Sequence, residues 1–505
     1  MTASVPVGPR GRLLALGEWE GVVRSRVGAG SRLAGLYGTD EEGSCQLTAL
    51  LADADRLEVV STIVAPDRDG VICYPSLSRD VPAAFWYERA LHDLSGVVPL
   101  RHPRLDPLLL DRAGTSPAPL PGAPASETTR PTIGERPGPV DVAGHGMFTL
   151  PLGPVRSGVF ESIEFLIETP GEDIPHLNVR PHYKHRGIAK QFESRPAGDA
   201  VLVAERVEGI SSVAHALAFC HAIETLGDLE VPAEARLVRT VLAELERISN
   251  HLDVTMRLAD AAGLAVATSR FGWHKERVMR LLSELCRSRF GRGTVTVGGL
   301  SRGVRIDAPA LTTELRRLDQ RIRADVAALE SSASFLDRLR TTGPLEAQVA
   351  RRYGALGPIG RASGVDNDVR RERPYDGYLD LAPVPRPRVT TGDVLARARV
   401  RWHELTTSHE LAIDALEMLG SRDVAPLAAP APAPPDGLGV GAAESAQGEV
   451  VHAVEISRGV VRRCFARSAS FHNLVLFHDV FAGDVFTDFP FIEASFGLGY
   501  AGVAM

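Results

Sequence analysis

A stretch rich in Pro, Gly, Ser and Thr interrupts this chain at residues 113–143 and separates two parts of different character. The stretch has few large apolar residues, which is typical of a linker or a surface loop. At 505 residues the chain is also long enough for more than one domain. We therefore expect a small domain over residues 1–112, a linker over 113–147 and a larger domain over 148–505.

The first part has the pattern of a small α/β unit. Residues 57–65, LEVVSTIVA, are apolar and β-branched, which favours a strand. Pro82 lies where a helix can begin, and Ala84 and Leu91 suit the interior of that helix. The sequence therefore predicts a strand followed by a helix in this unit.

The second part is mainly helical in its pattern. Pro232 precedes apolar residues at helical spacing, and Gly263 can end that helix. Further helical patterns lie near 270–290, 308–340 and 391–420, and strand-like segments lie at 160–169 and 294–299. We expect an α+β protein, in which an α/β domain precedes a mainly α-helical domain with a small β element at its start.

A second Pro-rich stretch lies near the end of the chain, at residues 424–449. Its Ala-Pro repeats favour an extended and solvated backbone. Patterned sequence resumes after it, so we interpret it as a low-complexity insertion within the larger domain.

Composition excludes several functional classes. The net charge of −7 gives no electrostatic basis for binding nucleic acid or an anionic membrane surface. No apolar run is long enough for a membrane span, and the N-terminus lacks the features of a signal peptide. The five cysteines are scattered without CxxC spacing, which favours reduced thiols. We find no P-loop, Rossmann fingerprint, nucleophile elbow or zinc pattern.

The first part carries a specific run of motif residues. They are Tyr74-Pro75-Ser76, Pro82-Ala83-Ala84, Trp86, Glu88-Arg89, Asp93, Gly96 and His102-Pro103. This run resembles the 30 kDa-type subunit of respiratory complex I and the equivalent N-terminal domain of formate hydrogenlyase-type large subunits. The resemblance implies a structural domain that mediates assembly.

The larger domain carries a second and longer series of motifs. In chain order they are PLGPVRSGVFESIEFLIETPGEDI (151–174), HYKHRGIAK (182–190), ERVEGISSVAH (205–215), ELERISNHL (244–252), VGGLSRG (297–303) and VEISRG (454–459). Together they resemble the large subunit of membrane-bound, energy-converting nickel–iron hydrogenases and the related 49 kDa-type subunit of complex I, which builds the quinone pocket. Each motif alone is weak, but their order and combination are specific.

The chain departs from this family where a metal would bind. The family holds nickel and iron with four cysteines, and Glu208, Ser211, Gly499 and Gly502 stand at those positions. Nickel–iron sites need soft thiolate ligands, so we expect no metal site in this chain. The resemblance also places a quinone-pocket histidine at the position of Arg156 and a tyrosine one residue after Glu208, and this chain has neither.

Two glutamates are the first candidates for chemistry. Glu208 could relay protons or bind a cation, or it could simply favour the positive end of a helix that begins near Ser211. Glu161 falls where the relatives place a glutamate thought to pass protons from the metal, but in a strand it could equally face water.

Basic residues form the second group of candidates. Arg156 and Arg458 could hold an anionic ligand, or they could neutralise Glu208 or Glu161, which is the option we favour. In the relatives the element that contains His185 and Arg186 packs near the site and a neighbouring iron–sulfur cluster, which favours a structural hydrogen-bonding role.

Ser211 and His215 are further candidates for lining the site. We interpret His215 as a histidine with satisfied hydrogen bonds at a helix interface.

The resemblance implies a subunit of an oxidoreductase complex. In this hypothesis the chain binds no cofactor itself, neither NAD nor an iron–sulfur cluster. It docks on a small iron–sulfur subunit and on antiporter-like and anchor membrane subunits, at the cytoplasmic face of the inner membrane. Electrons would reduce a quinone or another small acceptor, with coupling to ion transfer.

Two other hypotheses stay open at this point. The chain could be a structural subunit that anchors the iron–sulfur subunit to the membrane arm, or an active nickel–iron hydrogenase with unprecedented ligands. Filling of the site by Phe489, Phe491, Phe496 and their neighbours would favour the structural role, and a surviving polar cavity would favour redox chemistry.

Overall fold

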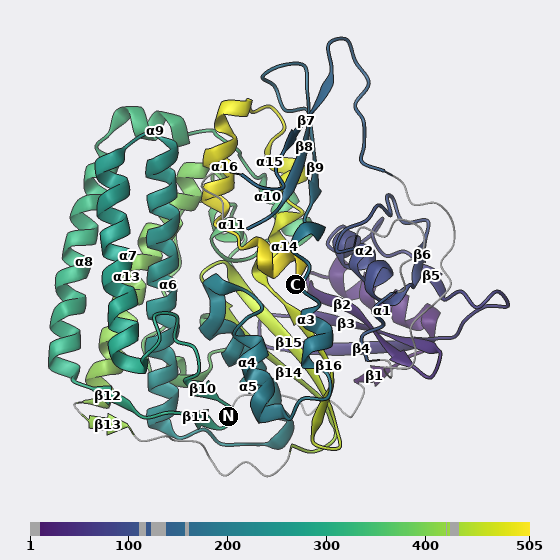
Figure 1. Ribbon diagram of the computed structural model, residues 1–505, viewed down its shortest axis with the longest axis horizontal. Coiled ribbons are helices and arrows are strands. Elements are labelled where there is room, and N and C mark those ends of the chain that lie inside the picture. Colours follow the sequence, from purple (N-terminus) through teal and green to yellow (C-terminus); the bar gives the residue numbers. More distant parts are fainter. Residues whose placement is uncertain (1–10, 111–117, 123–137, 157–160, 421, 425–433) are drawn as a thin grey trace.

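The computed structural model describes residues 11–110, 118–122, 138–156, 161–420, 422–424 and 434–505. Figure 1 shows an N-terminal α/β unit on one side, a bundle of long helices on the other, and a sheet between them. The expected α+β fold is therefore confirmed.

The N-terminal unit is built on a sheet with strand order β1-β4-β3-β2. Its elements are β1 (Arg12–Leu13), α1 (Leu16–Gly28), β2 (Arg32–Glu41), β3 (Ser44–Ala52), β4 (Leu57–Val64), β5 (Cys73–Pro75), α2 (Ala84–Ser95) and β6 (Val98–Leu100). The predicted strand at 57–65 and the predicted helix after Pro82 both form.

The helix bundle forms the far side of the larger domain. Its long helices are α6 (Ala233–Ala261), α7 (Ala265–Cys286), α8 (Ala308–Glu330) and α13 (Val394–Leu419). Between them lie β10 (Val295–Thr296), β11 (Gly299–Leu300), β12 (Val304–Ile306), α9 (Ala333–Leu339), α10 (Ala347–Tyr353), α11 (Gly357–Ala362), α12 (Val369–Glu372) and η3 (Asp376–Leu379), and β13 (Arg422–Val424) follows α13.

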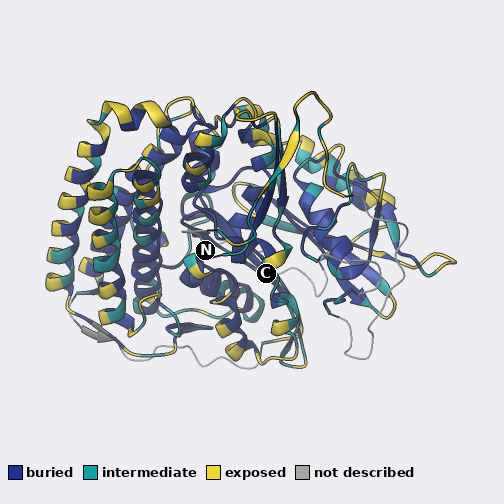
Figure 2. Cartoon of the chain, turned by 45° about the horizontal axis from the view of Figure 1, so that its top comes forward, coloured by how far each residue is buried: buried dark blue, intermediate teal, exposed yellow. Residues whose placement is uncertain are grey.

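The ends of these helices follow their sequence signals. Pro232 precedes α6, which ends two residues before Gly263, as expected. Asp393 caps α13, because its Oδ1 accepts a hydrogen bond from the Ala396 N–H at 2.8 Å. Figure 2 shows the bundle with exposed residues on its outer faces and buried residues inside, the distribution expected of amphipathic helices.

The sheet between the two units has the order β14-β15-β16. Its strands are β14 (Gly437–Ser445), β15 (Gly448–Ser457) and β16 (Val460–Arg467), and helix α5 (Ser212–Gly227) packs on one face. Gly439 and Gly441 permit this packing because they have no side chain. A Cβ at Gly439 would lie 2.0 Å from the Ala222 carbonyl oxygen, and a Cβ at Gly441 would lie 2.2 Å from the Ala218 carbonyl oxygen.

Strand β14 corrects one expectation from the sequence. Residues 424–449 were expected to be solvated, yet β14 and the start of β15 fall inside that range and are largely buried. Their Gly- and Ala-rich sequence reflects close packing against α5 and not low complexity. Residues 425–433, which carry the Ala-Pro repeats, lie outside the described residues.

The N-terminal sheet covers the opposite face of the sheet β14-β15-β16. Tyr37 of β2 stacks on Phe465 of β16 with ring centroids 4.5 Å apart. Arg467 of β16 donates a hydrogen bond from Nε to the Ala34 carbonyl at 2.9 Å. The apolar core is continuous from Trp19 to Val503, so the two units share it.

The remaining elements flank the candidate site. They are β7 (Phe148–Leu152), β8 (Glu164–Thr169), β9 (His176–Arg180), η1 (His182–Lys184), α3 (Ile188–Phe192), α4 (Ala197–Ala204), η2 (Gly209–Ser211), α14 (Ala469–Leu474), α15 (Phe477–Val480), η4 (Phe486–Asp488), α16 (Phe489–Phe496) and α17 (Tyr500–Ala504). Among the residues that the structure describes, no helix is both long and apolar enough to cross a bilayer.

Most of the predicted linker at 113–147 lies outside the described residues, so the boundaries at 112 and 148 stay a prediction. Within it, residues 118–122 and 138–147 are described. Leu120 is buried there, and its N–H donates a hydrogen bond to the Leu94 carbonyl at 2.8 Å.

Candidate functional site

The candidate site forms where two segments far apart in the sequence meet. Glu208 lies between α4 and η2 with its side chain fully buried. Gly499, directly before α17, and Gly502, in the middle of α17, face it. A Cβ built at either glycine would lie 2.7 Å from the Glu208 carboxyl group, so this side chain occupies the space that larger residues there would need.

One oxygen of the Glu208 carboxylate is held by α14. The Ser470 hydroxyl donates a short hydrogen bond to Oε1, and Ser470 Oγ in turn accepts the Gly499 N–H at 3.0 Å. The other oxygen, Oε2, is buried without a hydrogen-bond partner among the described residues and lies 3.8 Å from His215 Nε2. The carboxylate is thus anchored on one side only.

Burial raises the pKa of Glu208 to about 7, against the opposing effects of the Ser470 and Ser211 hydroxyls, the Gly499 N–H and the Arg186 charge. Desolvation disfavours the ionised carboxylate more than these neighbours stabilise it. A carboxyl group with a pKa near 7 can gain or lose a proton near neutral pH.

A nickel–iron centre does not fit these residues. The four positions offer one carboxylate, one hydroxyl and two glycines, and the Ser211 hydroxyl already donates to Gln447 Oε1 at 3.1 Å. Cysteines at Gly499 and Gly502 would collide with Glu208. Within the described part of the chain no cluster of three or more His, Cys, Asp or Glu side chains could hold a metal ion.

Glu161 lies close enough to Glu208 for their charges to interact. It precedes β8, so the strand expected at 160–169 begins only at Glu164, and its Oε2 accepts the Ala501 N–H at 2.9 Å. Burial raises the pKa of Glu161, and the charge of Glu208 raises it further. The structure therefore brings the two candidate carboxylates together.

Arg156 does not pair with either of them, which corrects the sequence interpretation. Its guanidinium binds the Glu493 carboxylate at two points, with distances of 2.5 and 3.1 Å. Tyr500 donates to the same carboxylate. Glu493 lies 337 residues away from Arg156, and no local pattern reveals the pair.

Arg458 lies outside the site, which is a second correction. Ser457 pairs with Val460, so Arg458 and Gly459 form a two-residue turn between β15 and β16, with φ angles of 52° and 76°. The Arg458 N–H donates to Asp436 Oδ1 at 2.6 Å, and the residue is exposed. Because Arg458 lies in this hairpin turn, its side chain points to solvent, although the surrounding motif resembles that of the relatives.

His185 and Arg186 tie the C-terminal helix to the rest of the domain. His185 Nδ1 hydrogen-bonds to the Ala504 carbonyl at 2.7 Å. Arg186 donates to the Val207 carbonyl at 2.6 Å and to the Ala501 carbonyl at 2.9 Å, which fixes Glu208 and α17 relative to each other. These contacts fit the structural role that we favour for this element.

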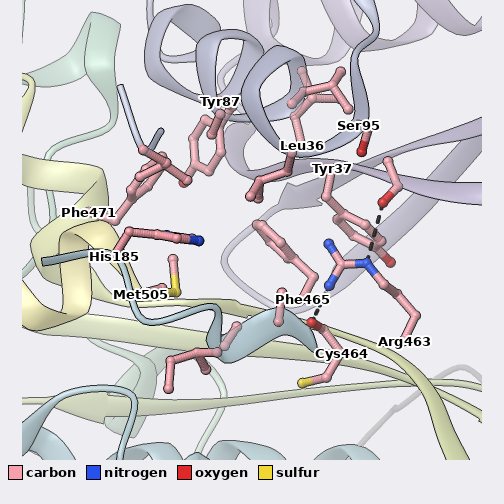
Figure 3. A pocket seen from close by; sticks show the side chains of 18 residues that line it. Leu36, Tyr37, Tyr87, Ser95, His185, Arg463, Cys464, Phe465, Phe471 and Met505 are labelled. Carbon is pink, nitrogen blue, oxygen red and sulfur yellow. Dashed lines mark hydrogen bonds between the residues drawn. The ribbon is translucent and has the colours of Figure 1, made fainter. Parts of the chain in front are cut away.

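His185 also lines a cavity of about 50 Å³ between the two units, and Glu208 is not among the lining residues. Figure 3 shows the His185 ring beside Met505 and Phe471, opposite Leu36 and Tyr87 of the N-terminal unit.

The aromatic residues of α16 do not account for the filling of the site. Phe489 packs against Phe165 and Phe481, and Phe496 packs against Phe477. Phe491 lies under the Arg338 guanidinium, 4.9 Å from it. The contacts at Gly499 and Gly502 come from Glu208 itself.

Sequence reasoning missed three side chains at this site, namely Ser470, Glu493 and His452. His452 of β15 is fully buried, and its Nε2 lies 2.9 Å from His215 Nδ1. His215 was expected to have satisfied hydrogen bonds, yet its Nε2 is buried without a partner among the described residues. Each missed residue reaches the site from a distant segment, so no spacing signal marks it.

The raised pKa of Glu208 predicts a pH-dependent stability. The folded state binds this proton more tightly than the unfolded chain, so its contribution is complete below about pH 4.5 and is lost as the pH rises through about 7. Wild type should lose on the order of 1–3 kcal/mol relative to Glu208→Gln across that window. Urea unfolding of both proteins at a series of pH values measures it, and parallel curves would contradict the prediction.

Comparison with known proteins finds two matching families along this chain. Residues 22–125 match the family of the respiratory-chain NADH dehydrogenase 30 Kd subunit, and residues 265–431 match that of the 49 Kd subunit. Formate hydrogenlyase subunit 5 of Escherichia coli K12 is 27% identical over 440 residues, which cover 84% of this chain and 75% of that protein. The membrane-bound hydrogenase subunit alpha of Pyrococcus furiosus is 30% identical over 323 residues, covering 61% of this chain and 76% of that protein.

A solved structure shares the fold. A chain from the structure of the membrane-bound sulfane sulfur reductase, an archaeal respiratory membrane complex, matches with a TM-score of 0.67 and 23% identity. The match covers 73% of this chain and 100% of that chain. This chain therefore belongs to the family of the complex I 49 kDa subunit and the membrane-bound hydrogenase large subunits, with a unit of the complex I 30 kDa type in front.

Proposed function

We propose that this chain is the nickel-free large subunit of a membrane-associated oxidoreductase complex related to complex I and to hydrogenases. A small iron–sulfur subunit would deliver electrons beside Glu208, where a quinone or another small acceptor is reduced. The names of the relatives support such an assembly, since they include membrane-bound hydrogenase and NADH-quinone oxidoreductase subunits.

The observation that carries this proposal is the buried Glu208 carboxylate at the position of a metal ligand. Reduction of a quinone consumes two electrons and two protons, so a site that receives only electrons cannot complete it. A carboxyl group with a pKa near 7 can give a proton at neutral pH and recover it afterwards. Glu161, whose pKa is also raised by burial, would pass the replacement proton from the solvent side.

The remaining partners follow from the same proposal. Antiporter-like and anchor subunits would form the membrane arm, and this chain would lie peripherally on the cytoplasmic face of the inner membrane. Proton exchange at Glu208 and Glu161 would couple acceptor reduction to ion transfer.

Glu208→Gln should lower the acceptor-reducing activity of the assembled complex by about 10²-fold, because glutamine has the same shape but cannot exchange a proton. Glu161→Gln should have an effect in the same direction. The matched control is Glu168→Gln in β8, a buried carboxylate that hydrogen-bonds to Thr149. Steady-state assays of the purified complex with a series of quinones and other acceptors measure the effect.

Elemental mass spectrometry of the same complex tests the nickel-free state. We expect no nickel, with all iron accounted for by the clusters of the partner subunit. Nickel near one atom per large subunit would overturn the proposal and make hydrogen evolution the next assay.

One observation favours a purely structural subunit as the second candidate. The Glu208 side chain fills the space between Gly499 and Gly502, so it could serve only to pack the site. In that case Glu208→Gln and Glu161→Gln would leave every activity of the assembled complex unchanged.

A further inference from the structure

Two buried polar atoms at the site face each other without other partners. Glu208 Oε2 and His215 Nε2 lie 3.8 Å apart, both side chains are fully buried, and neither atom has a hydrogen-bond partner among the described residues. Buried polar atoms are nearly always paired, because an unpaired one loses its hydration without compensation. A small shift of either side chain brings the two atoms within hydrogen-bond distance.

His215 continues into a line of buried polar groups. Its Nδ1 lies 2.9 Å from His452 Nε2, and His452 Nδ1 lies 3.6 Å from Cys464 Sγ. The line runs from the loop before α5, through α5 and β15, to β16. Arg463 and Phe465 face Tyr37 of the N-terminal unit, so strand alternation directs Cys464 to the opposite face, where His452 lies.

Burial favours the neutral form of both imidazoles. Burial lowers the pKa of His215 to about 3, and it lowers the pKa of His452 well below its usual value, with the Arg467 charge acting in the same direction. Phe192 and Phe219 pack edge-on against His452 and exclude water. A neutral imidazole has one N–H donor and one acceptor nitrogen. Each ring can therefore donate a hydrogen bond from only one of its two nitrogens at a time, while the other nitrogen accepts.

Two arrangements satisfy every contact in this line. When Glu208 is ionised, the Cys464 S–H donates to His452, His452 Nε2–H donates to His215, and His215 Nε2–H donates to Glu208. When Glu208 carries a proton, it donates to His215 Nε2, His215 Nδ1–H donates to His452, and His452 Nδ1–H points at Cys464 Sγ. In the second arrangement both histidines hold their proton on Nδ1 instead of Nε2.

We infer that Glu208, His215, His452 and Cys464 form one proton-sharing line, in which the charge on Glu208 sets the tautomer of both histidines. Each histidine gives up one proton and takes one, so its own charge does not change. When the line alone protonates Glu208, Cys464 gives up its S–H proton, and burial disfavours the resulting thiolate because it raises the pKa of this thiol. The two arrangements therefore differ by one proton, which comes from the solvent, and Cys464 must regain a proton to end as a thiol. His215 and His452 are thus positioning residues for the Glu208 proton.

The inference rests on the proposed function, because it takes Glu208 to be the group that exchanges protons there. Other charged groups also act on this line. The charges of Arg186 and Glu161 interact with that of Glu208. The charge of Glu208 raises the pKa of Glu246 on α6, and the charge of Arg467 lowers the pKa of both histidines. None of them contacts the nitrogens that change tautomer, so the tautomers report on Glu208 directly.

Nuclear magnetic resonance of the full chain with ¹⁵N-labelled histidine tests this inference, with His215→Asn and His452→Asn used to assign the signals. As the pH falls through the titration of Glu208, both rings should change from the Nε2–H to the Nδ1–H tautomer. In Glu208→Gln neither ring should change with pH. His478, whose Nδ1 hydrogen-bonds to the Leu177 carbonyl, is the internal control and should keep one tautomer.

Infrared spectroscopy of the same samples separates the two proposals. The carboxylic acid C=O band that is missing in Glu208→Gln reports the protonation of Glu208, and the S–H band that is missing in Cys464→Ser reports the far end of the line. If Glu208 titrates while both histidines keep one tautomer, the proton-sharing line is wrong and the proposed function stands. If Glu208 stays ionised throughout, both are wrong. His452→Phe should abolish the response of the Cys464 band and leave the Glu208 titration in place.

Discussion

Replacement of Arg361 by methionine is expected to lower the free energy of unfolding by about 3–5 kcal/mol, because it would leave buried carboxylates without a counter-ion. Arg361 is buried in α11 and donates to Glu404 Oε1 at 2.8 Å and to Glu444 Oε1 at 3.0 Å. Asp368 lies 3.6 Å away. Burial alone would raise the pKa of Glu404, but Arg361 and other neighbours hold it well below its usual value.

The measurement is urea unfolding followed by circular dichroism. Arg316→Met is the matched control, since Arg316 pairs with Glu417 at 2.6 Å while both side chains are exposed, and such pairs contribute about 1 kcal/mol or less. Equal shifts of the unfolding midpoint in the two variants would show that the buried network contributes no more than a surface ion pair.

Gly502→Ala should destabilise the protein by about 1–3 kcal/mol, because the new Cβ would lie 2.7 Å from the Glu208 carboxyl carbon. Gly502 lies within α17, where alanine is otherwise the better helix former, so the sign of the effect separates the collision from helix propensity. A stabilised variant would contradict the packing that we describe around Glu208.

A double-mutant cycle identifies the partner in this collision. Glu208→Ala removes the colliding atoms, so its combination with Gly502→Ala should be more stable than the sum of the single effects by about 1–3 kcal/mol. Glu208→Gln keeps the shape of the side chain, and its combination with Gly502→Ala should be additive. Additive behaviour with Glu208→Ala would mean that another group limits the space at Gly502.

Periodicity predicted the long elements of the fold well. The helix α6 begins after Pro232 and the strand β4 covers 57–64, because apolar spacing and a clear start signal act locally. The strand β14 was missed, since its glycines serve the approach of α5 and dilute the apolar pattern. A sequence does not distinguish such glycines from those of a solvated loop.

The sequence predicted which positions form the site, but not which side chains pair there. The motifs placed Glu208, Gly499 and Gly502 together, and the structure brings them into contact. They did not reveal which acidic residue neutralises Arg156, because Glu493 reaches it from a distant helix. Motifs record where a residue lies along the backbone, whereas ion pairing depends on side chains from all the segments that fold around it.

The contact between the N-terminal sheet and β16 has a consequence for synthesis. About 400 residues separate the end of β4 at Val64 from the start of β16 at Val460. At about 5–20 residues per second the ribosome needs roughly 20–80 s to make them. Throughout that time Tyr37 and the apolar face around it have no permanent cover, so the nascent chain should depend on a holding chaperone until its last strands emerge.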